Sequence, residues 1–166
     1  MTQTHKAYGL ITGLAIIIVS MILYVADLGF SSWGRYVGYI PFIIGLILNA
    51  QAFSKQNDHY VKFGQVFSSC FKACAIITLV VLAWSIASTY IFPDIVEKGL
   101  EEARKQMEQN PEMTQEQINA GLAMTKKFFV PFMIAGVLLS YMIIGAIFSL
   151  IAAAVPKKLG DRPQNA

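Results

Sequence analysis

Few side chains in this sequence could carry out chemistry, and none forms a recognisable catalytic set. The histidines are His5 and His59, which lack the spacing of metal ligands. His59 follows Asp58 and could serve as a base or a ligand, but two polar neighbours in a loop favour a solvated side chain. An enzyme acting on lipid would have to use Asp27, Arg35, Asp58 or His59, which show no acid, base and nucleophile arrangement. We therefore expect no enzyme.

The sulfur-containing residues indicate packing rather than redox or metal chemistry. Cys70 and Cys74 stand four residues apart on one expected helix face, too far along the axis for an easy disulfide. The seven methionines follow no repeated spacing, so we interpret them as apolar filler. The sequence predicts neither a metal site nor a cofactor.

Composition indicates that lipid surrounds most of the chain. Of its 166 residues, 55% are apolar and 14% charged, and the mean hydropathy is +0.54. Four uncharged runs, residues 8–25, 37–53, 73–92 and 128–155, have lengths that approach or exceed a membrane crossing. The run after Lys6 is too long for the apolar part of a secretory signal, so we expect it to be retained. The net charge of +3 is too small and dispersed to indicate nucleic-acid binding.

These runs predict an all-α polytopic membrane protein with four transmembrane helices. Residues 1–158 form a single membrane domain, and residues 159–166 form a polar C-terminal tail. An even number of crossings places both termini on one side. Lysines and arginines number seven on that side and six on the other, while eight of the ten acidic residues lie opposite the termini. Because Lys157 and Lys158 directly follow the fourth run, we predict cytoplasmic termini in a multi-pass protein of the inner membrane.

The segment before the third run carries apolar residues at helical spacing. Tyr60, Phe63, Phe67, Phe71 and Cys74 share one face. Lys62, Gln65, Ser69 and Lys72 occupy the opposite face. Two arrangements remain open: a separate helix in the cytoplasmic headgroup layer, or the lower end of one long tilted helix. Both would bury the aromatic face.

Residues 94–127 form the longest polar connection and predict an extracytoplasmic pair of amphipathic helices. Asp94 can cap the first helix, Asn110 and Pro111 separate the two, and Thr114 with Gln117 reads as a capping box. Glu101 and Lys105 are spaced for an ion pair. The apolar stripe, a candidate partner surface, comprises Val96, Leu100, Met107, Ile118 and Leu122. The pair either closes on itself over the bundle mouth or offers its stripe to a partner, and Gly121 permits a close approach.

Small residues four apart predict close contacts between the membrane helices, because lipid gives no hydrophobic drive for helix association. The candidate packing residues are Gly9, Gly13, Gly34, Gly38, Gly136, Ser140, Gly145 and Ser149. The same spacing can serve one chain or a homo-oligomer.

Several short motifs resemble a family of small bacterial membrane proteins. They are residues 8–13 (YGLITG), 63–67 (FGQVF), 113–117 (MTQEQ) and 124–128 (MTKKF). Together they resemble domain-of-unknown-function family 4199 of Gram-negative bacteria, over about residues 5–158. The resemblance implies an inner-membrane setting and four spans, and it brings no activity, ligand or catalytic residue.

Two functional hypotheses follow. The first is a non-enzymatic interaction or accessory subunit, with the bilayer and either a membrane-complex partner or a second copy as its contacts. The alternative is an oligomeric small-solute transporter or channel component. Its path would be lined by polar residues of the spans, namely Asn49, Ser85, Ser88, Thr89 and Ser140.

Overall fold

The computed structural model describes residues 3–29, 31 and 33–160, and in these ranges the chain is helical with no strand. Residues 161–166 of the expected tail lie outside the described residues. The helices are α1 (Thr4–Val25), α2 (Gly34–Val37), α3 (Tyr39–Gln56), α4 (Phe63–Ile91), α5 (Asp94–Glu108), α6 (Gln115–Lys127) and α7 (Phe129–Ala154).

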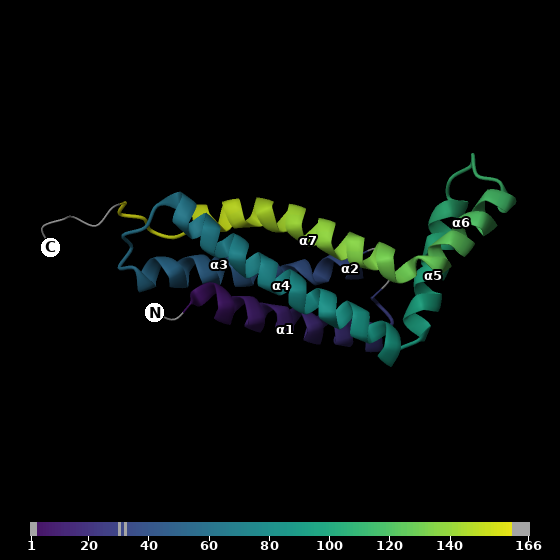
Figure 1. Ribbon diagram of the computed structural model, residues 1–166, viewed down its shortest axis with the longest axis horizontal. Helices are drawn as coiled ribbons and strands as arrows, with labels where there is room; N and C mark the ends of the chain where they lie inside the picture. Colours follow the sequence, from purple (N-terminus) through teal and green to yellow (C-terminus); the bar gives the residue numbers. More distant parts are fainter. Residues whose placement is uncertain (1–2, 30, 32, 161–166) are drawn as a thin grey trace, which may run out of the picture.

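Four long helices lie side by side along the longest axis of the molecule (Figure 1). α1 and α4 run from the end that holds both termini toward α5, and α3 and α7 run back. We call these ends the terminal end and the arm end. α5 and α6 form an arm, residues 94–127, which projects at an angle from the bundle (Figure 1). α4 is central, because it packs against α1, α3 and α7.

Apolar side chains lie both inside and outside the bundle. The core is centred on α3 and α4, where Phe42, Leu46, Cys70 and Ile77 are fully buried. Large apolar side chains are also exposed along the outer faces of α1, α3 and α7, including Leu14, Ile44 and Leu139. A continuous apolar exterior of this kind is stable in lipid and not in water. The bundle is therefore built for a membrane.

Three of the described helices are long and apolar enough to cross a bilayer: α1, α4 and α7. α3 corresponds to the second expected span but is only 18 residues long. Its last two turns contain Asn49, Gln51 and Lys55, which reduce its hydropathy. By length and composition alone the described helices thus supply three candidate spans rather than four.

A proline divides α2 from α3. Pro41 has no amide hydrogen, so it cannot bond the carbonyl of Val37 four residues earlier, and the regular helix is interrupted at Gly38. Gly38 keeps right-handed helical dihedral angles. α2 and α3 therefore continue one another across the break.

Residues 63–91 form one uninterrupted helix, which decides between the two arrangements left open for the segment before the third run. Within the bundle the aromatic face is covered only in part: Phe63 is 43% exposed and Phe67 partly buried, while Cys74 on the same face is fully buried. Ser69, expected on the polar face, is 4% exposed. The neighbouring helices pack on the small residues of α4, whose backbone they can approach closely, and leave the aromatic rings at the surface.

The ends of the arm helices follow the local sequence in part. The capping box is confirmed: the amide of Gln117 donates to Thr114 Oγ1 at 3.3 Å, and the amide of Thr114 donates to Gln117 Oε1 at 2.8 Å. The Glu101–Lys105 ion pair is also present, at 3.0 Å. Asp94 does not cap α5, which is preceded by Pro93, because its carboxylate accepts from Tyr24 of α1 and pairs with Lys98 of α5 itself.

Candidate functional site

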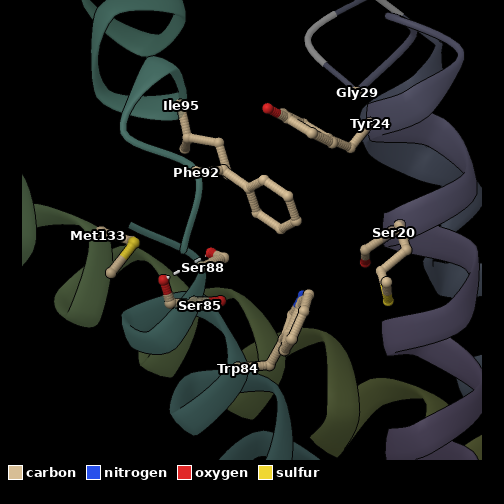
Figure 2. A pocket seen from close by; sticks show the side chains of 10 residues that line it. Ser20, Tyr24, Gly29, Trp84, Ser85, Ser88, Phe92, Ile95 and Met133 are labelled. Atoms are coloured by element: carbon tan, nitrogen blue, oxygen red, sulfur yellow. Dashed lines mark hydrogen bonds between the residues drawn. The ribbon is translucent and has the colours of Figure 1, made fainter. Parts of the chain in front are cut away.

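A cavity of about 320 Å³ lies at the arm end of the bundle, between α1, α4 and the start of α5 (Figure 2). Aromatic rings and hydroxyls share its wall. It is lined by Ser20, Met21, Tyr24, Gly29, Trp84, Ser85, Ser88, Phe92, Ile95 and Met133. We call it the arm-end cavity.

The polar groups of the arm-end cavity offer no nucleophile activated by a base. Ser20 Oγ donates to the carbonyl of Ile16 at 2.8 Å, and Ser88 Oγ donates to that of Ser85 at 2.9 Å (Figure 2). No histidine or carboxylate lines the wall. Across the described residues, no group of three or more histidine, cysteine, aspartate or glutamate side chains could hold a metal ion. The arrangement suits binding of an apolar group more than catalysis.

Four polar side chains beside this cavity connect α1 to α5, and we call them the clamp: Tyr24, Asp27, Asp94 and Lys98. Tyr24 Oη donates to Asp94 Oδ1 at 2.6 Å. Lys98 Nζ donates to Asp27 Oδ1 at 2.7 Å and lies 3.5 Å from Asp94 Oδ2. The ring of Tyr24 also lies 4.6 Å from that of Phe92, between centroids. These contacts fix the base of the arm to the end of α1.

The electrostatics of the clamp favour its charged forms. The hydrogen bond from Tyr24, with the positive charge of Lys98, lowers the pKa of Asp94 below its usual value. The hydrogen bond to Asp27, with the nearby charge of Asp94, raises the pKa of Lys98. Both shifts have the direction expected for an ion pair whose partners stabilise each other's charged form.

The apolar stripes of α5 and α6 face each other. Ile118 is 2% exposed, and Val96, Leu100, Met107 and Leu122 are partly buried. A Cβ atom added at Gly121 would lie 3.2 Å from Met107 Sδ, which shows how closely the two helices approach. In the described chain the two arm helices therefore pack on each other, and Leu100 and Leu122 also line a hollow on the surface of the arm. The arm lies at the arm end of the bundle and at an angle to it (Figure 1).

Four of the candidate packing residues lie where long helices touch. Cβ atoms at Gly9 and Gly13 would collide with Ile76 and Val80 of α4, at 2.9 and 2.7 Å. A Cβ at Gly145 would collide with Cys74 Sγ. Ser149 is fully buried in α7, and its hydroxyl has no hydrogen-bond partner.

The other four have different surroundings. Gly34 lies against the carbonyl of Leu28, in the connection from α1 to α2, rather than against a helix. Gly38 and Gly136 have no atom within 4 Å of an added Cβ, and Ser140 is partly buried. The four-residue spacing therefore coincides with contacts between long helices in α1 and in the second half of α7, and not at the other four positions.

Sequence reasoning missed Gly45, which forms the tightest contact between α1 and α3. A Cβ atom at Gly45 would occupy the position of the Thr12 side chain, with Thr12 Cγ2 at 2.6 Å and Cβ at 2.8 Å. The signal was present as a glycine in the middle of an apolar run.

The polar residues named for a transport path do not meet in the described chain. Asn49 lies fully buried between α3 and α4, where its Nδ2 donates to Ser69 Oγ at 3.2 Å and contacts Cys70 Sγ at 3.6 Å. Ser85 and Ser88 line the arm-end cavity, and Thr89 donates to the carbonyl of Ile86. A path would therefore require several copies, and the transport hypothesis stays a prediction.

His59 lies in the turn between α3 and α4 and is partly exposed, and its ring also contacts a buried serine. Ser54 Oγ, fully buried, donates to the carbonyl of Lys157 at 2.6 Å and lies 2.9 Å from His59 Nδ1. With the hydroxyl proton of Ser54 directed at Lys157, the Nδ1-protonated tautomer of His59 would donate to Ser54. The amide of Leu159 also donates to the carbonyl of His59 at 2.7 Å, so this cluster holds the C-terminal segment against the loop before α4.

The two buried cysteines are free thiols. Cys70 Sγ lies 3.6 Å from the carbonyl of Leu46 on α3, and Cys74 Sγ lies 3.4 Å from that of Tyr141 on α7. Both side chains join α4 to its neighbours, in agreement with a packing role.

Comparison with known proteins gives one family. The sequence model of the family described as "Protein of unknown function (DUF4199)" matches residues 7–158. No curated protein and no solved structure matches the chain.

Proposed function

We propose a function for this chain, which belongs to the family described as protein of unknown function (DUF4199). It is a four-span protein of the bacterial inner membrane with both termini in the cytoplasm. It acts without catalysis, as an accessory subunit that binds a partner through its projecting arm.

The case for α3 as a fourth span rests on its neighbours and its exposed face. With α2 it extends from Gly34 to Gln56, roughly 35 Å at 1.5 Å per residue, which matches the hydrocarbon thickness. It packs against α1, α4 and α7, the three helices long enough to span. Ile40, Ile44 and Leu48 form an exposed stripe facing away from the core. Polar residues lower its hydropathy, but Asn49 and Ser54 are buried against protein rather than exposed to lipid.

The charges at the two ends support cytoplasmic termini. At the terminal end, the Lys158 ammonium donates to the carbonyls of Ala153, Ala154 and Pro156, which neutralises the negative end of α7. Lys55 and Lys157 are exposed at the same end. The arm at the other end contains most of the glutamates. Cations concentrate on the cytoplasmic side of membrane proteins.

We expect a membrane-impermeant maleimide to label Gln109→Cys in intact cells and to leave Gln3→Cys and Lys157→Cys unlabelled until the membrane is opened. Gln3, Gln109 and Lys157 are exposed, whereas the native Cys70 and Cys74 are fully buried and give little background. Labelling is measured by the mass shift of the purified protein.

The alternatives give different patterns. Labelling of positions 3 and 157 but not 109 would show the reverse orientation. Labelling of only one of positions 3 and 157 would show an odd number of crossings, which would overturn α3 as a span.

The observation that supports the accessory role is the arrangement of the arm. The clamp fixes its base, and its two helices pack their apolar stripes against each other. Such a pair of helices presents polar faces at a defined angle to the bundle (Figure 1). A prepositioned surface loses little conformational freedom on binding. The hydroxyls bonded within the arm-end cavity, and the absence of a base beside them, support a role without catalysis.

Photoreactive amino acids on the arm test this role. Placed at Glu112 and at Ala120, both exposed, they are expected to give the same discrete protein adduct in native membranes, identified by mass spectrometry. The matched control is Leu139, 62% exposed on the outer face of α7, which should attach mainly to lipid. Adducts from Leu139 but none from the arm, neither to another protein nor to a second copy, would refute the accessory role.

A further inference from the structure

A second cavity, of about 360 Å³, lies at the terminal end of the bundle, where α1, α3 and α4 meet. Its wall is formed by one residue of α1, one of α3 and five of α4. They are His5, Phe53, Gly64, Gln65, Ser68, Ser69 and Lys72. We call it the terminal-end cavity. The proposed partner role does not use it.

The side chains of this cavity can donate hydrogen bonds, and no carboxylate lines it. The exposed Lys72 supplies an ammonium group, and Lys6 and Lys72 both act electrostatically on the His5 ring. Gln65 Oε1 already accepts from the amide of Lys62 at 2.8 Å, so its NH₂ group is the part left to bind a ligand. The wall is therefore suited to an anion.

Ser69 provides an independent indication of a ligand. It is 96% buried yet lines the cavity, and its Oγ accepts from Asn49 Nδ2, so its own proton points away from Asn49. Hydroxyls elsewhere in the membrane helices, such as those of Ser20, Thr78 and Ser88, donate to carbonyls of the preceding turn. Ser69 makes no such bond among the described contacts. Its proton is available to an acceptor in the cavity.

The backbone adds to the positive potential. α4 begins at Phe63, and the amides of Phe63 and Gly64 in its first turn have no acceptor within the helix, whereas that of Gln65 donates to the carbonyl of Lys62 at 3.1 Å. Gly64 lines the cavity, and a Cβ atom added there would meet nothing within 4 Å. A tetrahedral anion can therefore approach the amides directly.

We propose that the terminal-end cavity binds the phosphate group of an anionic phospholipid. Phosphate accepts several hydrogen bonds and carries the charge that Lys72 and the helix end favour. The lipid source follows from position, because the cavity opens at the end of a membrane bundle. The partly exposed rings of Phe67 and Phe71, stacked with centroids 5.9 Å apart on the same turns of α4, provide an apolar surface for acyl chains.

Native mass spectrometry of the purified full-length protein, titrated with phosphatidylglycerol, tests the proposal. Lys72→Gln should weaken binding about tenfold, the loss of one charge-assisted hydrogen bond. Ser69→Ala should weaken it as well. The matched control is Lys55→Gln, which removes the same charge from an exposed position at the same end but outside the cavity, and should leave affinity unchanged. Protection of Cys70 and Cys74 from a thiol reagent confirms that each variant is folded.

Three outcomes would overturn the proposal. One is failure of the wild-type protein to retain phosphatidylglycerol above phosphatidylcholine. Another is equal weakening by Lys72→Gln and Lys55→Gln, which would indicate diffuse charge attraction. The third is full displacement of the lipid by inorganic phosphate, which would assign the cavity to the free ion. None depends on the arm, so this site and the accessory role fail separately.

Discussion

Replacing Gly45 by leucine is expected to separate α1 from α3 and to destabilise the bundle by about 1–3 kcal/mol, the usual cost of overpacking a filled interface. The new side chain would have to occupy the volume of Thr12, whose Oγ1, Cγ2 and Cβ atoms all lie within contact distance of an added Cβ. A β-branched side chain has few rotamers in a helix, so Thr12 cannot turn away. The backbones must move apart instead.

The natural thiols report this change. Because Cys70 and Cys74 are 0% exposed, a fluorogenic maleimide reacts with them only when the bundle opens. The Gly45→Leu variant should react at a lower temperature than the wild type in the same detergent. Gly136→Leu is the matched control, since nothing lies within 4 Å of a Cβ at that position in α7, and it should leave the transition nearly unchanged. Equal shifts for both variants would mean that the Gly45–Thr12 contact does not hold α1 to α3.

Reversing the charge of Lys98 is expected to release the arm from the bundle. Lys98→Glu would place a third carboxylate beside Asp27 and Asp94, at positions now bridged by one ammonium group. Spin labels on Gln109→Cys and Lys157→Cys, measured by pulsed electron resonance, should change from a narrow to a broad distance distribution. Adding Asp27→Lys should narrow the distribution again, because it restores an opposite-charge pair across α1 and α5.

Lys105→Glu is the control for charge alone. It reverses a charge that pairs with Glu101 inside α5 and does not contact the bundle. It should leave the distance distribution narrow. A broad distribution in this control, or a narrow one in Lys98→Glu, would show that the clamp does not set the direction of the arm.

Acid should open the same clamp. Tyr24 and Lys98 hold the pKa of Asp94 below its ordinary value of 3.8. A carboxylate with a lowered folded-state pKa stabilises the closed form above the ordinary value, and the contribution is lost as the pH falls through the lowered one. The spin-label distribution of the wild type should therefore stay narrow near neutrality and broaden only in strong acid. Asp94→Asn should remove that acid transition.

The sequence predicts helices well and their contacts poorly. Length and hydropathy locate α1, α4 and α7, because a membrane crossing needs only an uninterrupted apolar run. The same signals do not show which face of a helix packs inside the bundle. The rings of Phe63 and Phe67 predicted the buried side of α4, whereas small residues such as Ser69 pack inside. In a membrane the apolar face of a helix can face lipid rather than the protein interior. Hydrophobic periodicity therefore does not indicate which face packs against other helices.

Local sequence patterns do not predict contacts between segments that are far apart along the chain. Asp94 has the position of a helix cap, and nothing nearby in the chain shows that Tyr24 would bind it instead. Ser54, which contacts the nearby His59, also donates to the carbonyl of Lys157, 103 residues later in the chain, and no local pattern indicates that contact. Both cases depend on how the helices are arranged.

The central position of α4 has a consequence for biosynthesis. The partners of the Asn49 side-chain nitrogen are Ser69 and Cys70, which the ribosome adds after α1 and α3 have both been made. Until α4 inserts, the amide of Asn49 faces lipid without a partner, an unfavourable state that raises the free energy of the half-made protein. The nascent chain should therefore wait beside the insertion machinery until α4 arrives, and enter the bilayer as a three-helix unit.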